Sequence, residues 1–115
     1  MRLLMAVIDD SSKIVHILDG FLQIGIRGST IIDSIGMAHL VADHVPIFSR
    51  FAELGGSERY NKTIFAVIQS ETHLEEAIRV IEQVVGDLRM PETGVVFVLP
   101  VERCIGLEKS YSDLP

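Results

Sequence analysis

The chain has 115 residues and a formal net charge of −6, and 48% of its residues are hydrophobic while only 6% are aromatic. This length suits a single domain, 1–115, with a Val/Ile-rich α/β core. The negative charge argues against nucleic acid as a partner, because phosphate neutralisation requires a basic face. Cys104 is the only cysteine, so no intrachain disulfide can form, which fits a reducing cytoplasm.

The first half of the chain is expected to form a strand, a helix and a second strand. The apolar run 1–8 is too short to span a membrane and lacks a signal-peptide cleavage region, so we interpret it as a strand. A helix over about 11–24 follows, with Asp10 or one of the two serines after it as the N-cap and Gly25 at its end. The second strand is expected over 29–35. The helix should bury one apolar stripe, formed by Ile14, Ile17, Leu18, Phe21 and Leu22.

A long connection, about 37–60, joins the two halves where a hairpin would suffice. Asp43 or His44 is a candidate cap for a short helix inside it, and Gly55-Gly56 would end that helix. The helix would carry an apolar face composed of Ile47, Phe48, Phe51 and Leu54. This face either folds back onto its own assembly or docks a partner protein, since exposed apolar patches mark interaction sites.

The second half repeats the order of the first. A strand is expected over 63–70 and another over 95–101, the latter after a turn that contains a proline and a glycine. Between them, Thr72 and Glu75 form a capping-box pattern at the start of a helix, and Gly86 is its expected end. The buried stripe of this helix should consist of Leu74, Ala77, Ile78, Ile81 and Val85.

A short internal repeat supports this division. Ala6-Val7-Ile8 recurs as Ala66-Val67-Ile68, and each copy is followed by a polar stretch and an amphipathic run. Two βαβ units in tandem predict an α+β fold, a ferredoxin-like βαββαβ sandwich with an antiparallel sheet. Both helices would cover one face of this sheet. The chain has no further segment for the other face, so we expect an oligomer with ligand clefts between subunits.

Two segments carry a family resemblance. Residues 25–33, followed by Gly36, resemble the end of the first helix and the second strand of the PII nitrogen-regulatory signal proteins. Residues 93–103 resemble their ligand loop and fourth strand. The resemblance covers about 1–103 and is weakest across 37–60. It implies a cytoplasmic homotrimer whose clefts bind adenine nucleotides or related small effectors, and whose long loop, here 37–60, contacts a target such as a membrane transporter or an enzyme.

The resemblance also implies which residues form the ligand site. The ligand-binding positions are Thr30, Gly36, Met37, Ala38, Thr93, Gly94 and Arg103. The partner-binding positions come instead from the apolar face of the long connection: Ile47, Phe48, Phe51 and Leu54.

This chain departs from the family pattern at the charged and polar ligand contacts. Leu40 stands where the family has a glutamine that helps to hold a magnesium–2-oxoglutarate complex, and Val95 stands where it has the lysine of the phosphate loop. Gly106 and Glu108 replace two further arginines. Because charged contacts dominate polyphosphate binding, we expect the classical ATP and 2-oxoglutarate site to be eroded or replaced, and the cofactor stays unassigned.

Other chemistry is weaker. His39, Asp43 and His44 have a spacing that would suit zinc or copper if the loop orders, but we assign no metal site. Cys104 has no histidine nearby in the sequence, and no set of nucleophile, base and orienting group can be assembled, so we expect no enzyme. The favoured function is a PII-like signal-transducing regulator. The alternative is a metal-binding or constitutive interaction trimer of the copper-tolerance-protein type, without nucleotide input.

Overall fold

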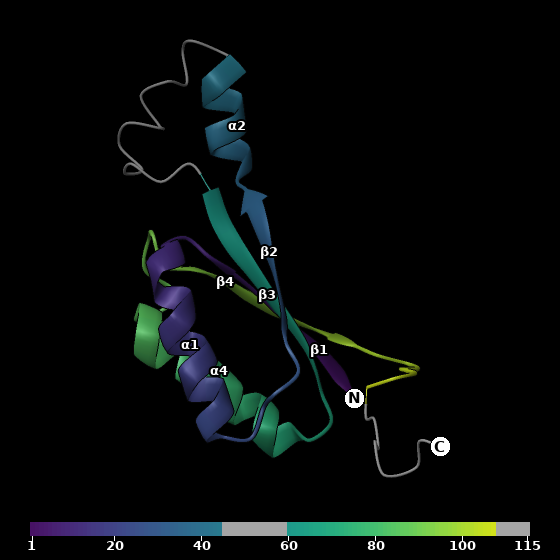
Figure 1. The fold of residues 1–115 in the computed structure, drawn as a ribbon. Helices are drawn as coiled ribbons and strands as arrows, with labels where there is room; N and C mark the ends of the chain where they lie inside the picture. The colour runs from purple at the N-terminus through teal and green to yellow at the C-terminus, as the bar shows by residue number, and fades with distance from the viewer. Residues whose placement is uncertain (45–59, 108–115) are drawn as a thin grey trace.

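The computed structural model describes residues 1–44 and 60–107. Its strands are β1 (Arg2–Ile8), β2 (Thr30–Ile35), β3 (Tyr60–Ile68) and β4 (Gly94–Pro100). Its helices are α1 (Ile14–Gln23), α2 (Met37–His44) and α4 (Glu71–Val85), with the short 3-10 helix η1 (Ser11–Lys13) before α1. The strands form one antiparallel sheet in the order β2-β3-β1-β4. α1 and α4 lie side by side on one face of this sheet (Figure 1). The predicted α+β fold of ferredoxin-like type is confirmed, with α2 inserted between the halves.

The sequence repeat occupies equivalent places in the two central strands. Ala6 and Ile8 of β1 and their counterparts Ala66 and Ile68 of β3 are all buried beneath the helices. The valine between each pair is half-buried and points to the opposite face, as strand alternation requires. The repeat therefore supplies the sheet floor of the core in both halves.

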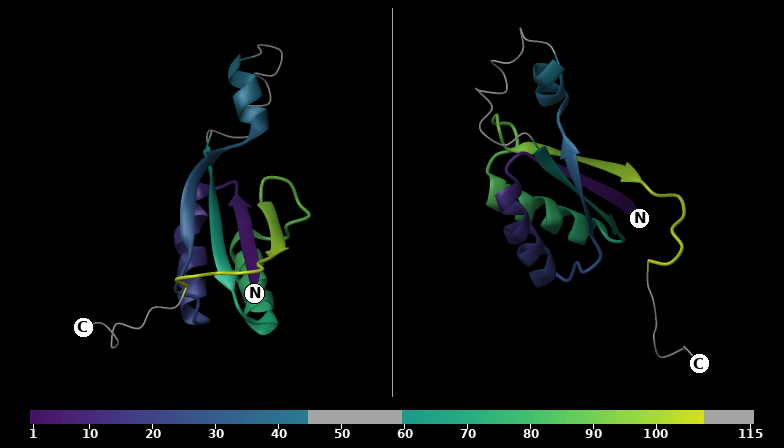
Figure 2. Two further views of the ribbon diagram at one scale, coloured as in Figure 1. Left: turned by 90° about the vertical axis from the view of Figure 1, so that its right-hand side faces the viewer. Right: turned by 45° about the horizontal axis from the view of Figure 1, so that its top comes forward.

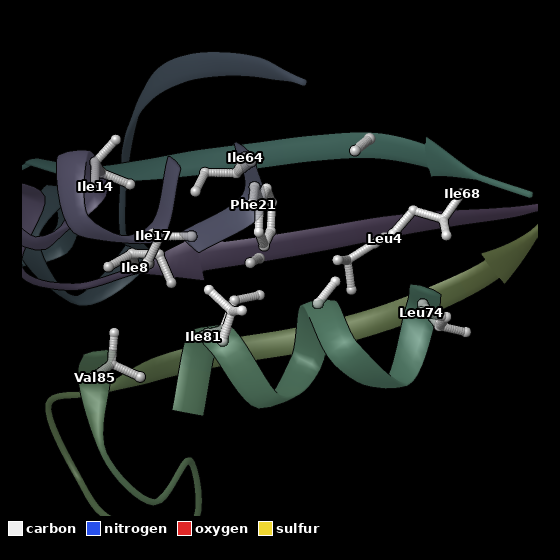
Figure 3. Close-up of a cluster of buried hydrophobic side chains, with 14 residues drawn as sticks. Leu4, Ile8, Ile14, Ile17, Phe21, Ile64, Ile68, Leu74, Ile81 and Val85 are labelled. Atoms are coloured by element: carbon white, nitrogen blue, oxygen red, sulfur yellow. The ribbon is translucent and has the colours of Figure 1, made fainter. Parts of the chain in front are cut away.

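The core lies between this floor and the two helices. In Figure 3, Phe21 and Ile17 of α1 and Ile81 of α4 point towards the sheet. Burying each large side chain of this kind contributes about 1.5–3 kcal/mol. The buried cluster consists of Leu4, Ala6, Ile8, Ile14, Ile17, Phe21, Ile64, Ala66, Ile68, Leu74, Ala77, Val80, Ile81 and Val85.

The prediction that Leu22 belongs to the core is wrong. Leu22 is 60% exposed, and Leu18 is only partly buried. The reason is the way α1 packs on α4: Gly20 approaches Val80 so closely that a Cβ at Gly20 would lie 2.5 Å from Val80 Cγ1. The side of α1 that contains Gly20 therefore faces α4, and Leu22 lies on the opposite side of the helix.

The helix ends follow local capping chemistry. The Asp10 carboxylate accepts a hydrogen bond from the backbone N–H of Ser12 at 3.0 Å, which confirms Asp10 as the cap before α1. The capping box at Thr72 and Glu75 is wrong. Ser70 is the N-cap of α4, because its backbone is still extended and its hydroxyl accepts from the N–H of His73 at 3.1 Å. Gly86 ends α4 with φ 94°, as expected.

The long connection begins with a helix that sequence reasoning missed. α2 starts directly after Gly36, whose carbonyl accepts from the N–H of Leu40 at 3.1 Å. Asp43 and His44 belong to the end of this helix, and the further helix that one of them was expected to cap lies outside the described residues. The predicted apolar face (Ile47, Phe48, Phe51 and Leu54) and the glycine pair 55–56 lie outside the described residues.

β2, β3 and α2 together form a projecting arm. Ser34 pairs with Asn61 and Ile35 with Tyr60, beyond the level at which β1 ends, since Ile8 is opposite Lys62. α2 continues from this hairpin away from the rest of the sheet (Figure 1; Figure 2). The arm therefore carries α2 to one extreme of the described structure.

The sheet face opposite α1 and α4, which we call the open face, is apolar. Ile32 and Val95 are each 50% exposed, and Phe97 and Leu99 are 42% and 41% exposed. Within residues 1–44 and 60–107, no helix lies over this face, and only the segment after β4 passes in front of one end of it (Figure 2). A smaller polar cluster on the same face joins the Ser34 hydroxyl to Asn61 and to the Thr63 hydroxyl, the latter at 2.9 Å. In the described part of the chain, no helix is both long enough and apolar enough to span a membrane.

Candidate ligand site at the two edges of the sheet

The predicted ligand residues occupy two edges of one sheet. Gly36, Met37 and Ala38 follow β2, which is one edge strand, and Thr93 and Gly94 lead into β4, which is the other. Asp33 pairs with Lys62, Lys62 pairs with Ile8, and Ile8 pairs with Gly94. Both groups therefore lie towards the same end of the sheet. Two strands stand between them, so three inter-strand spacings separate the edges by roughly 14 Å.

Two other predicted residues lie elsewhere. Thr30, on the edge strand β2, pairs with Phe65 half-way along β3. Arg103 follows the end of β4, where Pro100 pairs with Arg2. The fold thus brings together only sequence neighbours, and no single chain surrounds a small ligand with the whole set. Each edge carries part of the set: Thr30 and the start of α2 lie on the β2 edge, and Thr93 and Gly94 lie on the β4 edge, while Arg103 follows β4 at the opposite end of the sheet.

The loop before β4, residues 86–93, is held by its own hydrogen bonds. The N–H of Met90 donates to the Asp87 carbonyl and the Thr93 hydroxyl donates to the Met90 carbonyl, both at 2.9 Å. The Thr93 carbonyl in turn accepts from the N–H of Asp9 at 3.4 Å, which ties the loop to the end of β1. We call this segment the β4 loop. Its shape is therefore largely set without a ligand.

Gly94 has a structural reason to be glycine. Its φ is 138°, and a Cβ there would lie 2.2 Å from the carbonyl oxygen of Val7. The close approach of β4 to β1 therefore excludes a side chain. Glu92, two residues earlier, has φ 64°, which is uncommon for a residue other than glycine, and its side chain is exposed.

Two of the three charged side chains of the β4 loop, Asp87 and Arg89, are paired with each other. The Arg89 guanidinium donates from Nε to Asp87 Oδ1 at 3.0 Å and from Nη2 to Oδ2 at 2.8 Å. These bonds, together with one from the backbone N–H of Arg89, hold the pKa of Asp87 below its ordinary value and raise the pKa of Arg89. Sequence reasoning missed this pair, although an aspartate directly after a helix-ending glycine is a signal for a side-chain-closed turn.

The β2 edge offers mainly apolar and backbone groups. Met37 is 80% exposed and Leu40 is 46% exposed, and Ala38 is exposed as well. None of these side chains supplies a cation or an oxygen ligand. Val95 on the β4 edge is likewise exposed and apolar. Two of the departures from the family pattern, Leu40 and Val95, therefore fall on exposed positions.

Other candidate sites gain little from the structure. Two open hollows of about 290 and 350 Å³ lie along the outer flank of α4, both lined by Glu75 and Arg79, and neither includes a predicted ligand residue. Residues 1–44 and 60–107 hold no group of three histidine, cysteine, aspartate or glutamate side chains placed to bind a metal. The side chains of His39, Asp43 and His44 lie outside what the structure describes.

Comparison with known proteins bears on the fold. No protein-family model matches the chain, and no curated protein matches it. A solved structure of PII from Arabidopsis thaliana bound to citrate is similar, with a TM-score of 0.57 and 23% identity over 87% of this chain and 76% of that chain. The predicted resemblance to PII is confirmed at the level of architecture: the chain has the PII fold.

Proposed function

We propose that the chain is a PII-like regulator that binds a small effector in clefts between the subunits of a homotrimer. The observation that carries this proposal is the division of the predicted ligand residues between the two edges of the sheet. In a head-to-tail ring the β2 edge of one subunit meets the β4 edge of the next, and heterologous contacts of this kind close into rings. Gly36 and Ala38 of one subunit then approach Thr93 and Gly94 of its neighbour.

The open face supports the assembly on which this site depends. Ile32, Val95 and Phe97 lie on that face and are about half exposed in the single chain. Contiguous apolar surfaces of this kind are typical of subunit interfaces. A trimer in which the open faces meet at the centre covers them and leaves α1 and α4 outside.

The arm supports the regulatory part of the proposal. Only Gly36 separates α2 from the last residue of β2, so α2 begins next to the proposed cleft and ends far from the sheet body (Figure 1). A ligand that contacts Gly36 or Met37 interacts differently with different arm positions, and so shifts their populations. A target such as a transporter or an enzyme then binds one position of the arm in preference to the others. We place this activity in the cytoplasm and assign no catalytic residue.

The effector should carry less negative charge than ATP. Val95 and Gly106 supply no cation, and Arg89 is paired with Asp87. Arg103 is exposed and is a candidate for binding an anionic group; Lys109, the other candidate, lies outside the described residues. Backbone groups around Gly36 and Gly94 suit a planar or uncharged portion of a ligand.

A thermal-shift screen tests the proposal. The screen uses adenine nucleotides, cyclic dinucleotides, bicarbonate and divalent metals, because a ligand that binds only the folded state raises the melting temperature by mass action. We expect a shift with at least one weakly charged compound and little with magnesium-ATP. A shift with a metal alone would favour the metal-binding alternative, and no shift with any compound would favour a constitutive trimer.

A further inference from the structure

The β4 loop contains one cationic residue, and that residue is already engaged. Arg89 is the only lysine or arginine between 86 and 93. We propose that Asp87 sets the charge specificity of this loop by holding Arg89, so that the loop offers no free cation to a polyphosphate. This inference rests on the proposed function in one respect, namely that the β4 loop faces the ligand cleft.

The geometry of the pair explains how the arginine is withheld. Nε and Nη2 form the edge of the guanidinium that fits two oxygens at once, and both are directed at the Asp87 carboxylate, the Nη2–Oδ2 distance being 2.8 Å. A phosphate group is bound by the same bidentate edge. Asp87 and a phosphate therefore compete for one set of donors.

The position of the carboxylate is fixed by the backbone. Asp87 Oδ1 also accepts from the backbone N–H of Arg89 at 2.9 Å, and the Asp87 carbonyl accepts from Met90. The carboxylate is therefore preplaced by the turn and does not depend on the arginine for its position. Burial plays no part, because the Arg89 side chain is 90% exposed. Pairing alone keeps the guanidinium from an incoming anion.

Pyrophosphate is a suitable probe, because it presents the charge of a polyphosphate without a base or sugar. We would measure its affinity by titration calorimetry at low ionic strength for the wild-type chain and for Asp87→Asn, Arg89→Ala and the double variant. Asparagine keeps an oxygen that can accept from the backbone N–H of Arg89, so the turn is retained. Glu92→Gln is the matched control, since it removes one negative charge from the same loop and touches neither residue of the pair.

We expect Asp87→Asn to gain affinity for pyrophosphate beyond the gain that loss of one negative charge gives, because Arg89 is then free to bind the anion. An exposed ion pair is worth up to about a fivefold change in equilibrium constant, so Asp87→Asn should bind pyrophosphate about two- to fivefold more tightly than Glu92→Gln. The double variant should lose this gain, and Arg89→Ala alone should resemble the wild-type chain. Equal affinities for Asp87→Asn and Glu92→Gln would overturn the inference. A clear loss of affinity in Arg89→Ala would overturn it as well, because Arg89 would then already serve the anion.

The two proposals fail separately. If the wild-type trimer gives an effector shift in the thermal screen but Asp87→Asn gains nothing, only the role of Asp87 is refuted. If Asp87→Asn gains affinity through Arg89 but no effector shift and no trimer are found, the pairing stands as a property of the loop and the proposed function is refuted.

Discussion

Replacing Phe97 by serine should break the assembly without unfolding the chain. Phe97 projects from β4 on the open face, where 42% of the residue is exposed. An aromatic side chain buries about 200 Å² when fully covered, so about 80 Å² remains to be covered by a neighbouring subunit. At about 25 cal/mol per Å² this is worth about 2 kcal/mol per subunit and about 6 kcal/mol for three. At about 1.4 kcal/mol per power of ten, the association constant of the trimer should fall by about four powers of ten.

Light scattering after gel filtration is the assay, with the concentration lowered from high to low micromolar. The wild-type chain should remain a trimer, whereas Phe97→Ser should dissociate within this range. Leu22→Ser is the control, because Leu22 is an equally apolar surface residue, 60% exposed, on the outer flank of α1. A wild-type chain that is monomeric, or a Phe97→Ser variant that dissociates no more than Leu22→Ser does, would refute the reasoning.

Three further predictions concern stability, each measured by urea unfolding. Gly94→Ala should cost at least about 2 kcal/mol, because strained backbone alone costs about 1–3 kcal/mol and a Cβ there would lie 2.2 Å from a carbonyl oxygen of β1; Gly28→Ala, with no atom within 4 Å of its Cβ position, should change little. Ser70→Ala should cost about 1 kcal/mol through loss of the α4 cap and more than Thr72→Ala, and equal costs would return the cap to the predicted box. The pKa of Asp10 is lowered chiefly by the Ser12 hydroxyl and then by its N–H, so its stabilisation is present above the unfolded pKa and is lost as pH falls below about 4. Asp10→Asn should therefore lose less stability than the wild-type chain on acidification, and an identical acid profile would show that this carboxylate does not contribute.

The parts of the fold that were predictable from sequence are those fixed by local pattern. Burial of Ala6 and Ile8 and of their repeats follows from strand alternation, and the ends at Gly25 and Gly86 follow from the freedom of glycine to adopt positive φ. These signals depend on few neighbours, which is why they transfer directly from sequence to structure.

The features that were missed depend on contacts between elements or on competing local signals. The exposure of Leu22 follows from the approach of Gly20 to Val80, which no periodicity in α1 alone reveals. α2 was hidden because the long connection was judged by its length, although 37–44 contains neither glycine nor proline. The Asp87–Arg89 pair lies in a turn that the Asp87 side chain closes, and an aspartate is a known sequence signal for such a turn.

Candidate ligand residues can be listed from the sequence, but their positions in the sheet cannot. Sequence order does not say that β2 and β4 are opposite edges of one sheet; the strand order does. Once the edges are known, Gly36 and Gly94 lie about 14 Å apart on opposite edges of one sheet, so the proposed site requires a second copy.

Native mass spectrometry tests this dependence most directly. The ligand is the compound that gives the largest thermal shift in the screen, added to the wild-type chain and to Phe97→Ser at equal concentration. Phe97 is not itself a predicted ligand residue, and it lies mid-strand, opposite Met5 and three residues after Gly94. The account predicts three ligands on each wild-type trimer and none on the Phe97→Ser monomer. A monomer that binds this compound as tightly as the trimer does would contradict a site shared between subunits.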